Sequence, residues 1–455
     1  MFHLGKQFII LIICGCIFLL LLIIGIVYFL NRPKHKSCTP PCKLPNTCSP
    51  DGICTCVSTC GTKNCGTDNC GVANKCGSCT LSNYQCSPDG KCELNTFVAV
   101  GEGSDTIAWS DDGKIWNKIS SGSGFNKRGT CVASNGNVWV AGGEESGDNR
   151  KNMVFSTDNG RTWSPVTPPS GTASLNLKVN GLAWNGTNFI AVGFGFNGGK
   201  TAVWSEDGQI WNSSTSIFRL FLNSLACNET ICVALSIGPK AVIIYSDDSG
   251  NSWNEGTGEK FSDNSVGSFV AVNDNNKWIA ICKNSTGTST NILISSGGID
   301  WVSPTTTNNI FTGSDVELYC VAHDNGSNWV VVGNKGIGYS SDNGSKWEVA
   351  TKNNIPIKDY YHSVVYNGKI WVASGLSYIL YSSDGLSWTK SDTTNSFENH
   401  LCWNGTVWVL GALESPAIRW SEDVTKPWNN TPDTVFKSIP PILGVVHDIA
   451  CRYKV

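Results

Sequence analysis

The chain has 455 residues and a net charge of -3; 40% of its residues are hydrophobic and only 15% are charged. With 33 basic residues against 36 acidic ones it has no basic field to hold a polyanion, which argues against nucleic-acid binding. The hydrophobic content excludes a disordered chain.

The first predicted element is a membrane anchor. Residues 8–30 carry no charge, and a helix of that length reaches about 34 Å, enough to span a hydrocarbon core of about 30 Å. The run is longer than the apolar stretch of a cleavable signal peptide, about 7 to 15 residues. We therefore expect a cytoplasmic tail at 1–7, a signal-anchor helix at 8–30 and a linker at 31–37. Basic residues after the run outnumber those before it, which alone would keep the carboxyl side in the cytosol.

A cysteine-rich stalk follows and favours the opposite orientation. Residues 38–92 contain 12 cysteines and few large apolar residues, so disulfides are expected to hold this segment together in an oxidising compartment. The segment is duplicated, because Cys48–Cys54 recurs as Cys86–Cys92 with a Pro-Asp-Gly turn in each copy. A zinc site is the alternative, since Cys76 and Cys79 have ligand spacing. We predict six disulfides and a type II membrane protein.

A short segment, here called a corner, recurs eight times in the rest of the chain. Each copy reads Ser-x-Asp-x-Gly-x-x-Trp or one residue shorter, and successive tryptophans lie 40 to 48 residues apart. Ser and Asp side chains hydrogen-bond to nearby backbone, Gly takes a positive φ, and Trp packs beside the turn. Seven copies carry the aspartate, at Asp112, Asp158, Asp207, Asp248, Asp342, Asp384 and Asp423. The eighth has Gly297 in its place, and the Asp423 copy has Thr425 where Gly is expected.

The corners resemble the Asp-box (BNR) repeat of sialidases, sortilin-type receptors and several non-enzymatic β-propellers, and the resemblance covers residues 97–455. It implies a β-propeller in which the corner aspartates are structural rather than catalytic.

Four short strand patterns surround each corner, which is one propeller blade. The chain enters this region at Phe97 with a second strand and no first one, whereas residues 448–455 resemble a first strand with no second. We therefore predict an all-β fold at 97–455 of eight four-stranded blades, in which the carboxyl-terminal segment completes the first blade and leaves no free sheet edge. Seven blades is the alternative, if the copy around Gly297 is not a full blade.

If the first strand of each blade is innermost, the corners share one face of the ring with the turns between first and second strands. We call this the corner face. The opposite loop face carries the longer and more varied loops, so ligand binding is expected there. The candidate contacts on the loop face are Arg128, Arg150, Arg219, Tyr360, Tyr361 and His362.

A sialidase-like glycoside hydrolase is the enzymatic alternative. Such an enzyme needs three arginines around a carboxylate, a Tyr and Glu nucleophile pair and an acid/base Asp. The propeller has only six arginines. Residues 218–221 resemble the Phe-Arg-Ile-Pro element of that family only poorly, and they lie at a different place in the repeat. The sequence therefore predicts no catalytic residue, no metal site and no cofactor.

Two kinds of covalent modification are predicted. Sequons for N-glycosylation occur at Asn185, Asn212, Asn228, Asn284, Asn325, Asn343, Asn404 and Asn429. The alternative is that these Asn-x-Ser/Thr segments are only hairpin turns. Cys227 and Cys232 flank a tight turn and are predicted to pair, and at least one of the other propeller cysteines is expected to stay free or to bond another chain.

The leading prediction is a single-pass membrane protein whose stalk presents a propeller that binds a protein or glycan outside the cytosol. Anchor, cysteine module and asparagine-rich propeller together also resemble surface or virion-membrane proteins of giant DNA viruses, which would imply attachment to a host. A glycan-cleaving enzyme and a purely structural envelope component are the alternatives.

Overall fold

The computed structural model describes residues 47–48, 54–55, 84–86, 92–94, 96–119, 124–144, 152–169, 177–195, 201–216, 220–284, 291–306, 315–352, 355–393, 398–412, 417–432, 435–437 and 445–451. Backbone contacts divide the chain into two compact units, Met1–Glu93 and Leu94–Val455. The predicted tail, anchor and linker lie outside the described residues. Within the described part, no helix is both long and apolar enough to cross a bilayer.

The described part of the first unit consists of short hairpins at the two duplicated segments. β1 (Thr47–Cys48) pairs with β2 (Cys54–Thr55), so that Cys48 lies opposite Cys54. β3 (Tyr84–Cys86) and β4 (Cys92–Leu94) form a second two-stranded sheet along the second copy. The Pro-Asp-Gly segments therefore connect paired strands. The predicted zinc alternative at Cys76 and Cys79 lies outside the described residues.

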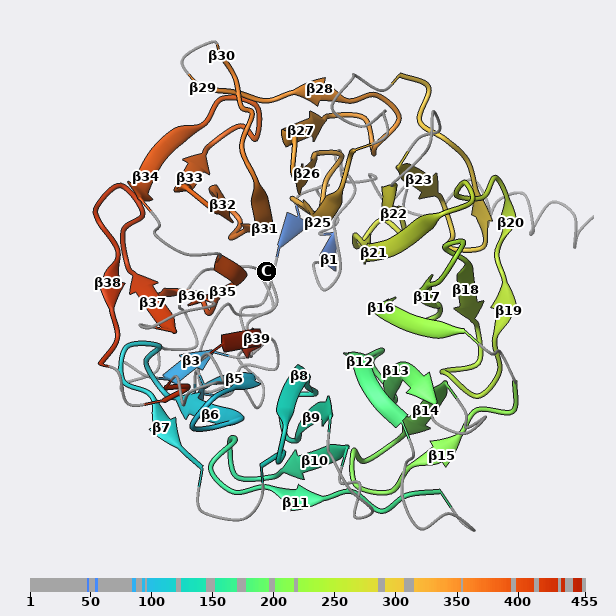
Figure 1. Ribbon diagram of the computed structural model, residues 1–455, viewed down its shortest axis with the longest axis vertical. Coiled ribbons are helices and arrows are strands. Elements are labelled where there is room, and N and C mark those ends of the chain that lie inside the picture. Colours follow the sequence, from blue (N-terminus) through green and yellow to red (C-terminus); the bar gives the residue numbers. More distant parts are fainter. Residues whose placement is uncertain are drawn as a thin grey trace, which may run out of the picture. The chain divides into compact units, whose positions relative to one another are not determined.

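The second unit is a β-propeller of eight blades, which confirms the predicted fold and blade number (Figure 1). Each blade is named here by its innermost strand. The innermost strands are β39 (Val445–Cys451), β8 (Arg128–Ser134), β12 (Leu177–Trp184), β16 (Phe221–Cys227), β21 (Ser265–Val272), β25 (Leu318–His323), β31 (Tyr361–Tyr366) and β35 (Glu398–Trp403). The second strands are β5 (Phe97–Glu102), β9 (Trp139–Glu144), β13 (Phe189–Gly195), β17 (Cys232–Ile237), β22 (Trp278–Asn284), β26 (Trp329–Gly333), β32 (Trp371–Gly375) and β36 (Trp408–Ala412).

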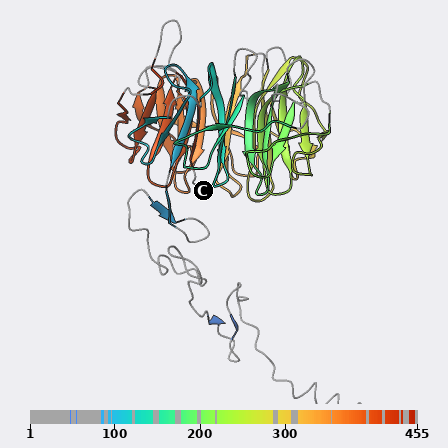
Figure 2. The same cartoon turned by 90° about the horizontal axis from the view of Figure 1, so that it is seen from below.

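The third strands end at the corner serines. They are β6 (Ile107–Ser110), β10 (Met153–Ser156), β14 (Ala202–Ser205), β18 (Ile243–Ser246), β23 (Ile292–Ser295), β27 (Gly336–Ser340), β33 (Tyr378–Ser382) and β37 (Ile418–Ser421). Seven blades have a short outer strand, namely β7 (Asn117–Lys118), β11 (Ser164–Pro165), β15 (Asn212–Ser213), β19 (Asn254–Glu255), β28 (Glu348–Val349), β34 (Thr389–Thr393) and β38 (Asn429–Asn430). In the side view of Figure 2, the strands of the blades run between the two faces of the ring.

The β21 blade has a different outer edge. Its β24 (Asp300–Trp301) pairs in parallel with β20 (Thr257–Gly258), which follows the outer strand of the β16 blade, and only an isolated bridge joins Ile294 to Val302. A further small hairpin, β29 (Thr351–Lys352) with β30 (Ile355–Pro356), precedes the β31 blade.

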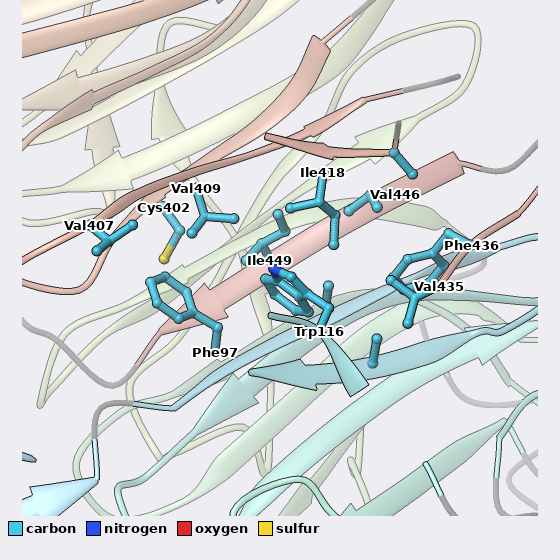
Figure 3. Close-up of a cluster of buried hydrophobic side chains, with 13 residues drawn as sticks. Phe97, Trp116, Cys402, Val407, Val409, Ile418, Val435, Phe436, Val446 and Ile449 are labelled. Carbon is cyan, nitrogen blue, oxygen red and sulfur yellow. The ribbon is translucent and has the colours of Figure 1, made fainter. Parts of the chain in front are cut away.

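The ring is closed by its carboxyl-terminal strand. β39 pairs antiparallel with β5, so that a strand at residue 445 completes the sheet that begins at residue 97. The described core consists of eight hydrophobic clusters, one at each boundary between neighbouring blades. At the seam, Phe97 and Trp116 pack with Val446 and Ile449 (Figure 3). The predicted closure is confirmed.

Every innermost strand contains a β-bulge near its start. The register with the second strand shifts at one residue in each blade, for example at Asn180 in β12 and His447 in β39. Asn180 donates from Nδ2 to the carbonyl of Leu222 at 2.9 Å, and Asn223 reaches Gly267 in the same way at 3.4 Å. The bulges therefore turn polar side chains toward the next blade, where they link successive innermost strands.

Candidate functional site

Arg128, predicted to contact a ligand on the loop face, is already paired. Its Nε and Nη2 donate to one carboxylate oxygen of Glu144 at 3.0 and 2.7 Å, and Lys178 Nζ lies 3.1 Å from the same oxygen. Partial burial opposes ionisation of Glu144, but the hydrogen bonds from Lys127, Arg128 and Lys178 outweigh it and lower its pKa to about 2. Arg128 thus links the first two strands of its blade. The candidates Arg150 and Arg219 lie outside the described residues.

The other three candidates are consecutive residues in three different environments. Tyr360 is 44% exposed on the surface, as expected of a contact residue. Tyr361 is only 1% exposed and packs in the core between the β25 and β31 blades, so it offers a ligand no surface and is removed from the candidate set. His362 is half-buried and stacks on Tyr319, with ring centroids 4.5 Å apart.

The corner carboxylates are directed into their own loops. Asp207 accepts the backbone N–H groups of Gln209 and Ile210, both at 2.8 Å, and the Ser205 hydroxyl at 3.1 Å. Trp211 donates from Nε1 to the carbonyl of Gly208. The same contacts to the corner serine or to loop N–H groups recur at Asp112, Asp158, Asp248, Asp342, Asp384 and Asp423. Seven corner carboxylates on seven different blades, each bonded within its own loop, do not form a catalytic pair.

The corner without an aspartate keeps its shape. Ser295 Oγ accepts the N–H of Gly298 at 2.9 Å, and Trp301 donates from Nε1 to the Gly298 carbonyl at 3.2 Å. A Cβ built on Gly297 would meet no atom within 4 Å. We expect Gly297→Asp to raise the free energy of unfolding by about 1 kcal/mol, because the new carboxylate can accept the loop N–H groups as in the other corners. Urea denaturation of G297D and, as a control without an acceptor, G297A checks this; equal stability of the two contradicts it.

Several predicted glycosylation sites are instead turn residues. Asn185 is 4% exposed; its Oδ1 accepts the N–H groups of Thr187 and Asn188 while Nδ2 donates to Ser249 Oγ. Asn404 is 1% exposed and makes the same turn contacts. Burial therefore rules out both as acceptors on the folded protein. Asn212 and Asn429, at the start of outer strands, are exposed, and Asn228, Asn325 and Asn343 are half-buried. The side chain of Asn284 lies outside the described ones.

The predicted disulfide between Cys227 and Cys232 is confirmed, and it joins the end of β16 to the start of β17. The corresponding strand ends in other blades carry aromatic pairs, for example Trp184 with Phe189 at 4.7 Å. Covalent and aromatic contacts therefore fix the same hairpin position in different blades. Cys131, Cys282 and Cys320 are free thiols, which agrees with the expectation that at least one cysteine stays unpaired.

The structure places a cavity on the corner face, where the sequence did not predict one. Its volume is about 770 Å³ and it is formed by the last residues of five innermost strands, β12, β16, β21, β25 and β31, with the turns that follow them. We call it the axial cavity. Trp184, Tyr366 and His323 line it from different blades, and Glu229 and Asp274 are the charged residues among the described ones that line it. The repeated Asn turn after the first strands is a sequence feature that contributes to this cavity, and as a local pattern it indicates only a hairpin.

Inside the axial cavity, His323 is held in its neutral form. Its Nδ1 accepts the N–H of Asn325 at 3.2 Å, and its ring packs on Trp329 at 4.9 Å. Burial lowers the pKa of His323, although the Val272 backbone and the carboxylates of Asp274 and Asp324 oppose the shift. None of the described residues that line the cavity is therefore cationic at neutral pH.

Acid is expected to destabilise the propeller. Burial is the main cause that lowers the pKa of His323, His362 and His447. Near and below the unfolded-state pKa of about 6.5, the unfolded chain therefore binds more protons than the folded one. The free energy of unfolding consequently decreases as the pH is lowered. Asp448 acts in the opposite sense, since burial raises its pKa. We expect the melting temperature to fall between pH 7 and pH 5, and His323→Gln to flatten the slope. A rise over this range contradicts the assignment.

No protein-family model matches the sequence, and no curated protein matches it. Among solved structures, the computationally designed Ika8 protein superposes with a TM-score of 0.50 at 12% identity, over 76% of this chain and 95% of that one. The C-terminal WD40 domain of Sif2 gives 0.47 at 14% identity, over 71% and 91%. YCF48 bound to a D1 peptide gives 0.44 at 13% identity, over 67% and 92%. At these identities the likeness concerns the fold alone, and residues 94–455 form an eight-bladed β-propeller.

Proposed function

We propose that this chain is a single-pass type II membrane protein whose propeller binds a protein or glycan outside the cytosol, without catalysis. The axial cavity carries the proposal, because it combines a volume of about 770 Å³ with aromatic and acidic side chains on a rigid ring. The apolar run at 8–30 and the 12 cysteines of the stalk support the anchor and the compartment. We further propose that the corners are structural Asp-box repeats, and that the chain serves as an attachment protein on a cell or virion surface.

Hydrolysis of a sialic acid glycoside is the second candidate, and the arginines argue against it. Arg128, Arg161 and Arg419 are the described arginines, and each pairs with a carboxylate of its own or a neighbouring blade, namely Glu144, Asp111 and Asp392. These three guanidinium groups therefore do not converge on one substrate carboxylate. The described lining of the axial cavity has two acidic residues and no Lys or Arg, so we expect it to repel a sialic acid.

Two assays of the full-length chain test the proposed function. A glycan and peptide array is expected to give saturable binding, and a fluorogenic sialoside is expected to show no turnover above buffer. Turnover would favour the enzyme. Absence of binding to cells and to both arrays would favour a purely structural envelope component.

Glycan occupancy tests the proposed compartment. After expression in a secretory system, we expect glycans at the exposed Asn212 and Asn429 and none at the buried Asn185 and Asn404 of the folded protein. Enzymatic removal of N-glycans in oxygen-18 water, followed by peptide mapping, measures this. Protease protection of the carboxyl-terminal region in microsomes is the matching topology test, and a digested propeller would place it in the cytosol.

A further inference from the structure

Three of the amides that line the axial cavity, Asn185, Asn228 and Asn273, are already committed to the fold. Asn228 Oδ1 accepts the N–H groups of Thr230 and Ile231 at 2.9 and 2.7 Å, and its Nδ2 donates to Asn276. Asn273 is buried; its Oδ1 accepts two turn N–H groups and its Nδ2 donates to the carbonyl of Gly326. Asn185 is committed in the same way. These side chains leave few free partners for the many hydroxyls of a sugar.

Two carboxylates at the cavity, in contrast, carry no such bonds within the described part of the chain. Glu229 lies on the turn after β16 and Asp274 on the turn after β21, so the two stand on neighbouring blades. Both residues are exposed, and the structure shows no ion pair or hydrogen bond of either carboxylate within its described part. Asp324, on the next blade, is occupied by Gly326 and Asn328 but adds a third negative charge near His323. Since no Lys or Arg occurs among the described residues that line the cavity, the potential that these residues create is negative.

Aromatic and small apolar side chains form the rest of the wall. Trp184 of the β12 blade and Tyr366 of the β31 blade are half-buried on the first and the last of the five blades that line the cavity. The ring centroid of Trp184 lies 4.7 Å from that of Phe189, and the ring centroid of Tyr366 lies 4.6 Å from that of Trp371. Between them, Ala271, Ala322 and Val365 are half-buried in the cavity wall. Such a surface suits the methylene stem of a long basic side chain, and the indole and phenol faces suit its charged end.

We propose that the axial cavity binds a basic segment of a protein partner, with a lysine or arginine side chain inserted so that its charge lies near Glu229 and Asp274. This inference rests on the proposed binding function and narrows its ligand from a protein or glycan to a cationic peptide. The methylene stem of the inserted residue packs on the small apolar side chains of the wall, and Trp184 and Tyr366 flank the inserted side chain. A neutral glycan fits the cavity less well because Asn185, Asn228 and Asn273 already bond to the protein.

Fluorescence anisotropy with the full-length chain tests the inference. The probes are a labelled Gly-Lys-Gly-Lys-Gly peptide, the same peptide with both lysines acetylated, and a labelled neutral chitotetraose. We expect the lysine peptide to bind at least about tenfold more tightly than its acetylated form, and the binding to weaken with salt. Glu229→Gln and Asp274→Asn should each weaken it about threefold to fivefold, and the double variant about tenfold.

Glu206→Gln is the matched control, because Glu206 is an exposed carboxylate in a corner and does not line the cavity. The affinity of the E206Q variant for the lysine peptide should equal that of the unchanged protein. Equal binding of the lysine and acetylated peptides, or equal effects of E206Q and E229Q, overturns the inference. Binding of chitotetraose without the lysine peptide also overturns it but leaves the binding function standing, whereas that function fails only if the arrays and cells show no ligand at all.

Discussion

Removal of residues 445–455 is expected to lower the melting temperature by about 10 °C or more, or to prevent folding. The deletion takes Val446 and Ile449, 0% and 5% exposed, out of the cluster that contains Phe97 and Trp116. It also leaves β5 with an unpaired edge at the seam of the ring. The lost burial and the lost strand pairing cost about 8 kcal/mol or more in total, which for a domain of this size corresponds to a shift of about 10 °C.

Calorimetry of the full-length chain and of two truncations measures the effect. Deletion of residues 452–455 is the control, since it leaves β39 in place. Ile449→Ala is the milder variant, with an expected loss of about 2 to 4 kcal/mol in the free energy of unfolding. A synthetic peptide of residues 445–455 should restore part of the stability of the longer truncation. If that truncation melts within a few degrees of the intact chain, the ring is not closed by this strand.

The second large effect is expected at a glycine opposite a bulge. In β13, a Cβ added to Gly193 would lie 1.9 Å from the backbone carbonyl oxygen of Lys178 in β12. Backbone atoms cannot move aside as a flexible side chain can, so Gly193→Ala should separate the two strands and lower the free energy of unfolding by about 3 kcal/mol. Gly101 and Gly375 face the same close approach in other blades, at 1.9 and 2.1 Å.

Gly238→Ala is the matched control for this prediction. The nearest atom to its added Cβ lies at 3.8 Å, so alanine should be neutral or slightly stabilising through the lower entropy of the unfolded chain. Urea denaturation of the two variants, with comparison of their midpoints and slopes, checks the difference. Similar midpoints for G193A and G238A would contradict the proposed role of the bulges.

The parts of the fold that the sequence predicts are those set by local chemistry. Most corners combine a hydroxyl, a carboxylate acceptor, a glycine with positive φ and an indole within eight residues, so their spacing is visible as a repeat; Gly160 and Gly208 have φ of 77° and 73° as that reasoning requires. Closure could be predicted because residues 448–451 repeat the pattern of another first strand. The Cys227–Cys232 bond could be predicted because the two residues flank one short turn.

The axial cavity could not be predicted in this way. Its lining comes from strand ends of five blades and from turns of four of them, and no local sequence pattern indicates which of these segments face a common space. The bulges were also missed, because one extra residue in a short strand leaves no clear signal in the alternation of polar and apolar residues. This omission explains the error at Tyr361. The register shift at His362 puts Tyr361 into the core, whereas the sequence pattern predicts a loop residue on the surface at this position.

Hydrogen exchange of the full-length chain with and without the lysine peptide tests most directly whether ligands are recognised at the axial cavity. The peptide should slow exchange in the turns at 184–188, 228–232 and 273–277, and leave the loop face around Arg128 and Tyr360 unchanged. Slower exchange confined to the loop face, with no change at these turns, would contradict the assignment of the binding site.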